Sequence, residues 1–261
     1  MPTPPANVRI AMAQMLVECG EREANLERAS RMIARAAELR CRMVVLPECL
    51  DLGWTWPGAR TEAQPIPGPA SDTLAEAARR ASIYVVAGLT ERAGERVYNA
   101  AVLISPAGEI LLRHRKINEL DIARDLYACG GSLAVAQTDV GIVGLAICAD
   151  NFPESLCLGH ALGRMGAQLV LSPCAWAVDA DHDNAREPYG ELWLGAYTTL
   201  TRAHPMTVVG VSNVGWLTAG PWRGRKCIGC SIAMGPGGEL LKMAPYGENA
   251  ETLVVVEAPL S

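Results

Sequence analysis

The chain has 261 residues, half of them hydrophobic and a fifth charged, with a formal net charge of -5. This balance is typical of a compact globular protein and excludes a disordered or fibrous chain. The length predicts one domain over residues 1–261. Lys and Arg are scattered and form no basic stripe, so nucleic acid is not an expected partner.

The opening residues lack the basic start and apolar stretch of a secretory signal, and no apolar run is long enough to span a bilayer. We therefore expect a cytoplasmic protein that does not contact a membrane. In that compartment the nine cysteines should be reduced.

The predicted elements occur twice in the same order, which indicates two equivalent halves. Each half has a strand, a helix, a short buried strand, a further helix and strand, and a hairpin with Pro and Gly at its turn. The matching segments are residues 8–14 and 143–149, 43–48 and 169–174, 80–89 and 202–211, and 101–112 and 232–241.

The helix expected over residues 23–40 shows how each half must pack. Its apolar residues share one face and its charged residues lie elsewhere. The apolar set is Leu26, Ala29, Ile33, Ala36 and Ala37. Two sheets, each covered by helices on one side, would bury their bare faces against each other. The predicted fold is therefore α/β, a four-layer α-β-β-α sandwich built from two pseudo-equivalent halves.

Three reactive residues stand at strand or hairpin ends in one half only. Glu48 ends the run Val-Val-Leu-Pro-Glu where the other half has Cys174, Lys116 follows a hairpin arm, and Cys148 closes a strand. Singly, each is more often a solvated charge or a packed thiol. Together they form a mechanism, because a carboxylate can deprotonate a thiol while an ammonium stabilises the thiolate and an oxyanion.

The chain resembles the nitrilase superfamily of carbon-nitrogen hydrolases over nearly its whole length. The motifs that carry the resemblance are Glu23 to Leu26, Leu46-Pro-Glu48, Tyr98-Asn99, Arg113-His-Arg-Lys116, Cys148-Ala-Asp150, Phe152-Pro-Glu154 and Gly235-Pro-Gly-Gly-Glu-Leu. The family's sandwich fold agrees with the duplication. The resemblance implies a homodimer or larger homo-oligomer.

By this resemblance, Cys148 is the nucleophile and forms a thioester, and Glu48 is the general base and then acid. Lys116 and the backbone N–H of Ala149 hold the oxyanion. Relatives often carry a second glutamate before the nucleophile. Glu119 is the only glutamate in that stretch, with Asp121 and Asp125 as less favoured choices and a solvated loop charge as the alternative.

The residues after the nucleophile bear on the substrate. Nitrile-cleaving relatives often have Cys-Trp-Glu, whereas Cys148-Ala-Asp resembles the amide-cleaving and carbamoyl-cleaving ones. The expected partner is a small amide or N-carbamoyl compound. Trp54 and Trp176 are candidate pocket walls, with ordinary packing or a subunit contact as the alternative.

Three other functions stay open. A nitrilase acting on a nitrile would use the same residues, and a catalytically silent binding protein would keep the fold alone. Cys227 and Cys230 have the spacing of a zinc or redox pair, although no second pair or His completes a ligand set. Neither a metal nor an organic cofactor is expected, since a glycine-rich phosphate loop is also absent.

Overall fold

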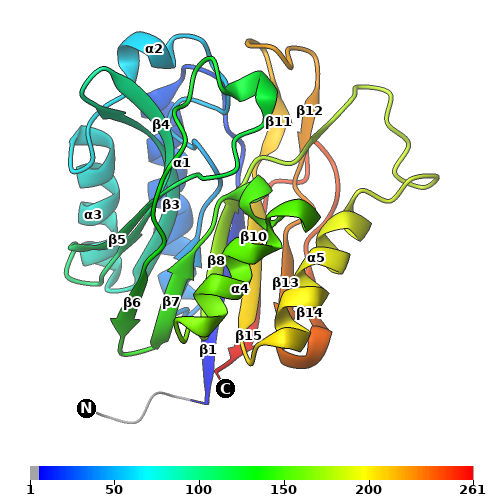
Figure 1. Ribbon diagram of the computed structural model, residues 1–261. Helices are drawn as coiled ribbons and strands as arrows, with labels where there is room; N and C mark the ends of the chain where they lie inside the picture. Colours follow the sequence, from blue (N-terminus) through cyan, green and yellow to red (C-terminus); the bar gives the residue numbers. More distant parts are fainter. Residues whose placement is uncertain (1–5, 261) are drawn as a thin grey trace.

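Two six-stranded sheets form the centre of the protein, and helices cover the outer face of each (Figure 1). The computed structural model describes residues 6–260. No helix within this range combines the length and the apolar character needed to cross a membrane.

The first sheet comes from the first half of the chain plus the C-terminal strand. Its strands, in spatial order, are β15 (Thr252–Pro259), β1 (Asn7–Gln14), β2 (Met43–Val45), β3 (Tyr84–Ala93), β4 (Arg96–Ile104) and β5 (Ile110–Arg115). The accompanying helices are α1 (Arg22–Glu38), α2 (Ala59–Glu62) and α3 (Pro69–Ala81).

The second sheet comes from the second half. Its strands, in spatial order, are β14 (Glu239–Met243), β13 (Ile232–Gly235), β10 (Thr207–Ser212), β8 (Leu169–Cys174), β7 (Gly141–Leu145) and β6 (Val135–Thr138). Its helices are α4 (Leu156–Arg164) and α5 (Gly190–Ala203). A third, small sheet holds β11 (Val214–Trp216), β12 (Lys226–Ile228) and β9 (Ala177–Val178). Short 3₁₀ turns are η1 (Asp121–Ala123), η2 (Cys148–Asn151), η3 (Pro153–Ser155) and η4 (Pro236–Gly238).

The strand order confirms the internal duplication. The series β1-β2-β3-β4-β5 in one sheet corresponds to β7-β8-β10-β13-β14 in the other, with parallel pairs inside and antiparallel hairpins at the end. The remaining strand of each sheet, β15 or β6, pairs antiparallel with the first strand of its series. The C-terminal strand therefore completes the sheet of the first half.

Alternating side chains of β1 show why the layers stack as predicted. Ile10 and Met12 belong to the apolar core shared with the second sheet. Ala11 and Ala13 belong to the separate core beneath α1, where Ile33 is fully buried. Since successive side chains of a strand point to opposite faces, a central strand with both faces covered must be apolar throughout. The four-layer sandwich follows.

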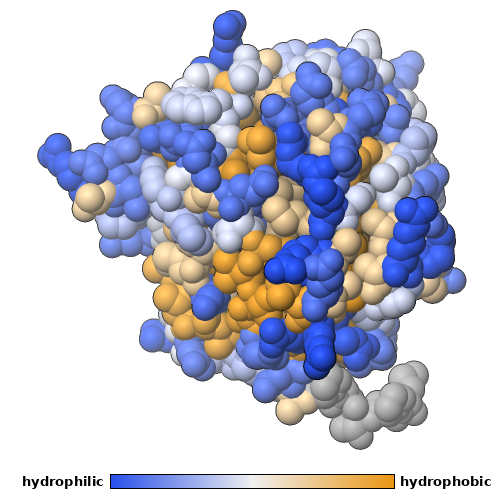
Figure 2. Space-filling model, turned by 180° about the vertical axis from the view of Figure 1, so that it is seen from behind, coloured by the Kyte–Doolittle hydropathy of each residue, from blue (hydrophilic) through white to orange (hydrophobic). Residues whose placement is uncertain are grey.

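Several exposed apolar residues lie on the edge strands of the two large sheets. Leu240 and Met243 on β14 are 47% and 37% exposed, and Leu253, Val254 and Val255 on β15 are half-buried. Figure 2 shows apolar side chains gathered in the lower half of the rear face, with charged residues around them.

Candidate active site

The candidate catalytic residues come together where the ends of strands from both sheets meet. Glu48 lies three residues beyond β2, Lys116 directly follows β5, and Cys148 opens η2 beyond β7. The backbone N–H of Glu48 donates to the carbonyl of Cys174, the last residue of β8, at 3.2 Å. This bond joins the two sheets at the site, so residues far apart in the chain share one buried volume.

Glu48 and Lys116 form an ion pair that is closed to solvent. Lys116 Nζ donates to Glu48 Oε1 at 2.7 Å, and each side chain is 1% exposed. The amide of Asn99 on β4 donates to the same oxygen at 2.6 Å. Glu48 Oε2 has no hydrogen-bond partner. Two donors thus occupy one carboxylate oxygen and leave the other as the basic one.

Cys148 occupies a turn that few non-glycine residues adopt. Its φ is 43°, in the left-handed region. Its backbone N–H donates to Ser172 Oγ at 3.2 Å, and Asn151 Nδ2 donates to the same oxygen at 3.0 Å. Tertiary contacts therefore hold the strained backbone in place.

The pKa of the Cys148 thiol is raised well above its usual value. A side-chain hydrogen bond with Cys174 contributes most, followed by burial and the negative charge of Glu48, while the Lys116 ammonium acts in the opposite direction. The sulfur therefore rests as a thiol, and an adjacent base must take its proton before it can attack.

Lys116 stays charged despite its burial. Desolvation acts to lower the pKa of its amine, but the charge and hydrogen bond of Glu48, together with Glu119 and Cys148 when these are ionised, outweigh it and raise the pKa well above the ordinary value. The ammonium also lies 5.8 Å from the ring centroid of Trp54, which is buried. The indole ring of Trp54 therefore lies on the Lys116 side of the candidate site.

Glu119 lies beside Lys116, with Oε2 4.0 Å from Nζ. Burial raises the pKa of its carboxyl to about 8, with the charge of Lys116 opposing and that of Glu48 adding to the rise. Neither of its oxygens has a hydrogen-bond partner. Asp121 and Asp125, the other carboxylates of this segment, are exposed.

Asp150 ties the Lys116 segment to the Cys148 turn. Its two oxygens accept four hydrogen bonds: from His114 Nε2 at 2.8 Å, and from the backbone N–H groups of Ile117 at 3.0 Å, Asn118 at 2.8 Å and Ile147 at 2.9 Å. Burial acts to raise the pKa of Asp150, but the hydrogen bond and charge of His114 and the backbone donors keep it below the usual value. The clamp therefore joins the backbone that follows Lys116 to the backbone that precedes Cys148.

Ala149 and Trp176 lie on the other side of the nucleophile. Ala149 is fully buried in the first turn of η2, where backbone N–H groups lack intrahelical partners. Trp176 is buried and stacks on Trp193 at a centroid distance of 4.6 Å. Tyr189 lies 6.4 Å from the Trp176 ring, and burial, followed by the proximity of Cys148, raises the pKa of its phenol well above the usual value. Trp176 and Trp193 belong to the same buried apolar cluster as Cys148, and Tyr189 packs against that cluster.

Within residues 6–260, no group of three or more His, Cys, Asp or Glu could hold a metal ion. All nine cysteines are free thiols. Cys227 is buried, and desolvation raises its pKa to about 12, which disfavours the thiolate that a zinc site needs.

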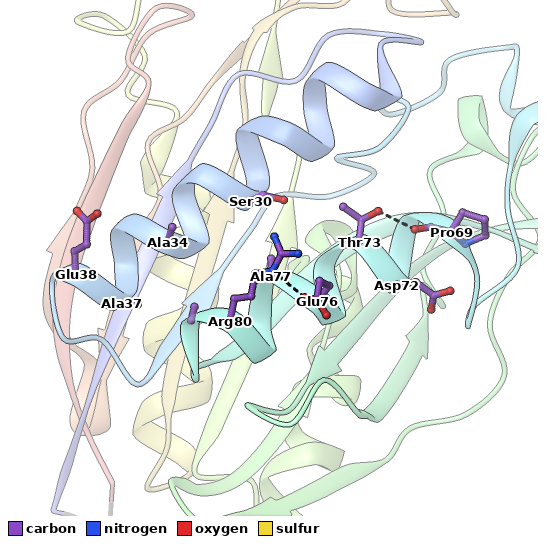
Figure 3. A pocket seen from close by; sticks show the side chains of 11 residues that line it. Ser30, Ala34, Ala37, Glu38, Pro69, Asp72, Thr73, Glu76, Ala77 and Arg80 are labelled. Carbon is purple, nitrogen blue, oxygen red and sulfur yellow. Dashed lines mark hydrogen bonds and ion pairs between the residues drawn. The ribbon is translucent and has the colours of Figure 1, made fainter.

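The groove of about 840 Å³ between α1 and α3 lies on the outer face of the first helical layer (Figure 3). Ala34, Ala37 and Ala77 form its floor, and Glu38, Asp72, Glu76 and Arg80 are among its polar lining residues. None of the candidate catalytic residues lines it. It is therefore separate from the site between the sheets.

Four residues of the site had no role assigned from sequence: Asn99, His114, Ser172 and Cys174. Asn99 directly precedes the apolar run Ala-Ala-Val-Leu-Ile within β4, and a polar residue inside a buried strand signals a buried hydrogen bond. Ser172 likewise interrupts the apolar β8. These signals indicate burial but cannot indicate the partner.

Comparison with known proteins gives consistent matches. A family model described as carbon-nitrogen hydrolase matches residues 9–261. A nitrilase of Pyrococcus abyssi is 31% identical over 97% of this chain and 90% of its own length. An omega-amidase of Xenopus tropicalis is 31% identical over 66% of this chain, and that match spans 64% of the relative's length.

Solved structures share the fold. A mutant of the Nesterenkonia AN1 amidase from the nitrilase superfamily superposes with a TM-score of 0.81 at 23% identity, covering 99% of this chain and 94% of that one. A carbon-nitrogen hydrolase from Helicobacter pylori G27 gives a TM-score of 0.83 at 20% identity, covering 98% of this chain and 90% of that one. A structure of another mutant of the Nesterenkonia amidase shows covalent addition of the acetamide moiety of fluoroacetamide at the active-site cysteine of that protein.

Proposed function

The chain belongs to the carbon-nitrogen hydrolase family, and we propose that it hydrolyses a small amide or N-carbamoyl compound through a thioester on Cys148. One observation carries the proposal. The buried ion pair of Lys116 and Glu48, 2.7 Å apart, lies beside a thiol whose pKa responds to both charges. This arrangement supports the assignment of Glu48 as base, Cys148 as nucleophile and Lys116 as the fixed positive charge.

In the first half-reaction, Glu48 takes the thiol proton through its unpartnered Oε2 as the sulfur of Cys148 attacks the amide carbon. The carbonyl oxygen becomes negative, and the Lys116 ammonium and the N–H of Ala149 stabilise it. Glu48 then passes its proton to the leaving nitrogen, and the amine or ammonia departs. The thioester remains.

In the second half-reaction, water enters the space that the leaving group vacated. Glu48, again ionised, removes a proton from this water as its oxygen attacks the thioester carbon. The same oxyanion donors act a second time. Collapse of the intermediate breaks the C–S bond, releases the acid and returns the proton to the sulfur.

The protonation state of Glu119 favours an amide-like substrate over a nitrile. Because burial raises its pKa to about 8, its carboxyl group is largely protonated at neutral pH and carries one donor and one acceptor. A carboxamide presents the complementary pair of an N–H donor and a carbonyl acceptor. A nitrile offers an acceptor only, so it would leave one hydrogen-bonding position of Glu119 unused.

A nitrile substrate remains the second candidate, favoured by the 31% identity to the Pyrococcus abyssi nitrilase over 97% of this chain. The same sulfur would attack the nitrile carbon. The third candidate is a catalytically silent binding protein of this fold. Under this hypothesis, ligands bind without turnover.

Ammonia release from a panel of amides, N-carbamoyl compounds and nitriles, together with intact mass, tests the proposal. We expect turnover of amides or carbamoyl compounds, no turnover by Cys148→Ala, and a loss of at least about 100-fold in Glu48→Gln, since a general base contributes roughly 10²–10⁴-fold. The control Cys41→Ser changes a buried thiol near Arg9 on the far side of the fold.

Fluoroacetamide provides an independent measure of the nucleophile. Treated wild-type protein should gain the mass of one acetamide moiety, located at residue 148 by peptide mapping, and Cys148→Ala should gain none. Hydrolysis that persists in Cys148→Ala would refute the assignment of the nucleophile. Binding of panel compounds with no product would favour the silent binding protein.

A further inference from the structure

A second cysteine lies at the step of β8 that faces the nucleophile. In the parallel pair of β7 and β8, Leu145 is the register partner of Leu171, and Cys148 and Cys174 each stand three residues further along. The ladder itself ends at Leu145, and Cys148 stands beyond it in η2. The proximity of the two cysteines is therefore shown by their side-chain contacts.

Contacts around Ser172 show that the two cysteines share one small volume. The backbone N–H of Cys148 donates to Ser172 Oγ at 3.2 Å, and Cys174 Sγ lies 3.4 Å from the same oxygen. A side-chain hydrogen bond also joins Cys148 and Cys174. The two thiols therefore face each other.

Hydrolysis as proposed above has no use for Cys174. Glu48 supplies the base and Lys116 the positive charge, and Cys174 is fully buried. A serine or alanine would fill the position without a reactive group. A free thiol next to a catalytic thiol is instead the arrangement that allows a sulfenic acid to be captured.

We propose that Cys174 is a resolving thiol: a hydroperoxide oxidises Cys148, and Cys174 then closes a Cys148–Cys174 disulfide that reversibly silences the site. The inference rests on the proposed function only in taking Cys148 as the reactive sulfur. Hydrogen peroxide is the oxidant of suitable size, because Cys148 is 8% exposed.

The two steps balance as follows. The Cys148 sulfur, after its proton has moved to Glu48, attacks one peroxide oxygen. The O–O bond breaks, water leaves with the second oxygen and the proton, and Cys148 becomes a sulfenic acid. The Cys174 sulfur then attacks the sulfenic sulfur, the S–O bond breaks, and a second water leaves with the Cys174 proton. Two thiols are oxidised and one peroxide is reduced to two waters.

The disulfide has two consequences for the enzyme. It occupies the sulfur that would attack the amide carbon, so hydrolysis stops. It also prevents further oxidation of Cys148 to sulfinic acid, which thiol reagents do not reverse. Reduction by dithiothreitol should therefore restore activity only when Cys174 is present.

The test treats the full chain with hydrogen peroxide, blocks the remaining thiols in denaturant and measures intact mass and linked peptides. Wild-type protein should carry blocking groups on seven of its nine thiols, lose about 2 Da apart from the mass of those groups, and give a peptide pair joining residues 148 and 174. Dithiothreitol should then return amide hydrolysis to near its untreated rate. Cys174→Ser should instead gain about 32 Da at Cys148 and recover at least about tenfold less of its own untreated activity.

Cys41→Ser is the matched control and should behave like wild type, because it also removes one buried thiol but leaves the pair intact. Sulfinic acid in wild-type protein without the linked peptide, or full recovery of Cys174→Ser, would overturn the inference. The mass measurement does not depend on turnover. If the disulfide forms but the protein hydrolyses nothing, only the proposed function is refuted. If the protein is active but forms no disulfide, only the present inference is refuted.

Discussion

Replacement of Asp150 by Asn tests how much the clamp between the Lys116 segment and the Cys148 turn stabilises the fold. Asp150 is 1% exposed and accepts four hydrogen bonds at 2.8–3.0 Å. An Asn side chain keeps one acceptor oxygen and turns the other into an NH₂ donor. Whichever way the amide is oriented, the NH₂ faces two donors that used to be satisfied.

The orientations differ only in which donors are lost. In one, the N–H groups of Ile117 and Asn118 lose their acceptor; in the other, His114 and Ile147 do. A buried donor without a partner costs about 1–3 kcal/mol, so two cost about 2–6 kcal/mol. If His114 changes tautomer and accepts a hydrogen bond from the new NH₂ group, the cost lies at the lower end of this range.

Urea unfolding of Asp150→Asn, followed by circular dichroism, measures this loss of unfolding free energy. The control is Asp121→Asn, which removes an exposed carboxylate paired only with Arg124 and should change the free energy by about 0–1 kcal/mol. A free energy of unfolding for Asp150→Asn within about 1 kcal/mol of wild type would refute the account of the clamp, since each lost donor alone should cost that much.

Three further changes probe the site. The folded state holds the Glu119 proton more tightly than the unfolded state, with a pKa of about 8 against 4.5 when exposed. The free energy of unfolding should therefore fall as pH rises between these values. Urea titrations of Glu119→Gln should show no such pH dependence from this group. Gly88→Ala should lower both stability and activity, because the new Cβ would lie 2.5 Å from Glu48 Cα. The control Gly131→Ala, whose Cβ would have no atom within 4 Å, should lower neither. Equal melting temperatures of the two variants would contradict this prediction. Asn99→Ala removes a hydrogen bond to the Glu48 carboxylate, which contributes about 1.5–3 kcal/mol. We therefore expect kcat to fall roughly 10–100-fold, with KM less affected. A change in kcat under about twofold would argue against a role of Asn99 in positioning Glu48.

Much of the fold could be predicted because its signals are local and repeated. The amphipathic face of α1, the apolar strands β2 and β8, and the Pro-Gly turns between hairpin arms recur in order. What local patterns could not predict is that β15 completes the sheet of the first half, since Thr252–Pro259 pairs with Asn7–Gln14 from the opposite end of the chain.

The residue types of the site were equally readable. Glu48, Lys116 and Cys148 have complementary chemistry and stand at strand ends, which suggested one mechanism. Glu119 could be named only as one of several carboxylates. Its burial beside Lys116, and the exposure of Asp121 and Asp125, depend on how the segment after β5 folds back over the site.

Side-chain chemistry and hydrophobic periodicity are properties of short segments, so the chemical groups and the doubled architecture could be predicted from the chain alone. Which of these groups meet depends on the three-dimensional fold. Lys116 reaches Glu48 across 68 positions of chain, Asn99 occupies one oxygen of that carboxylate, and Cys174 is brought opposite Cys148 by the pairing of two strands. Such distances are set by strand register and by the packing of one sheet on the other, and no short stretch of sequence encodes either.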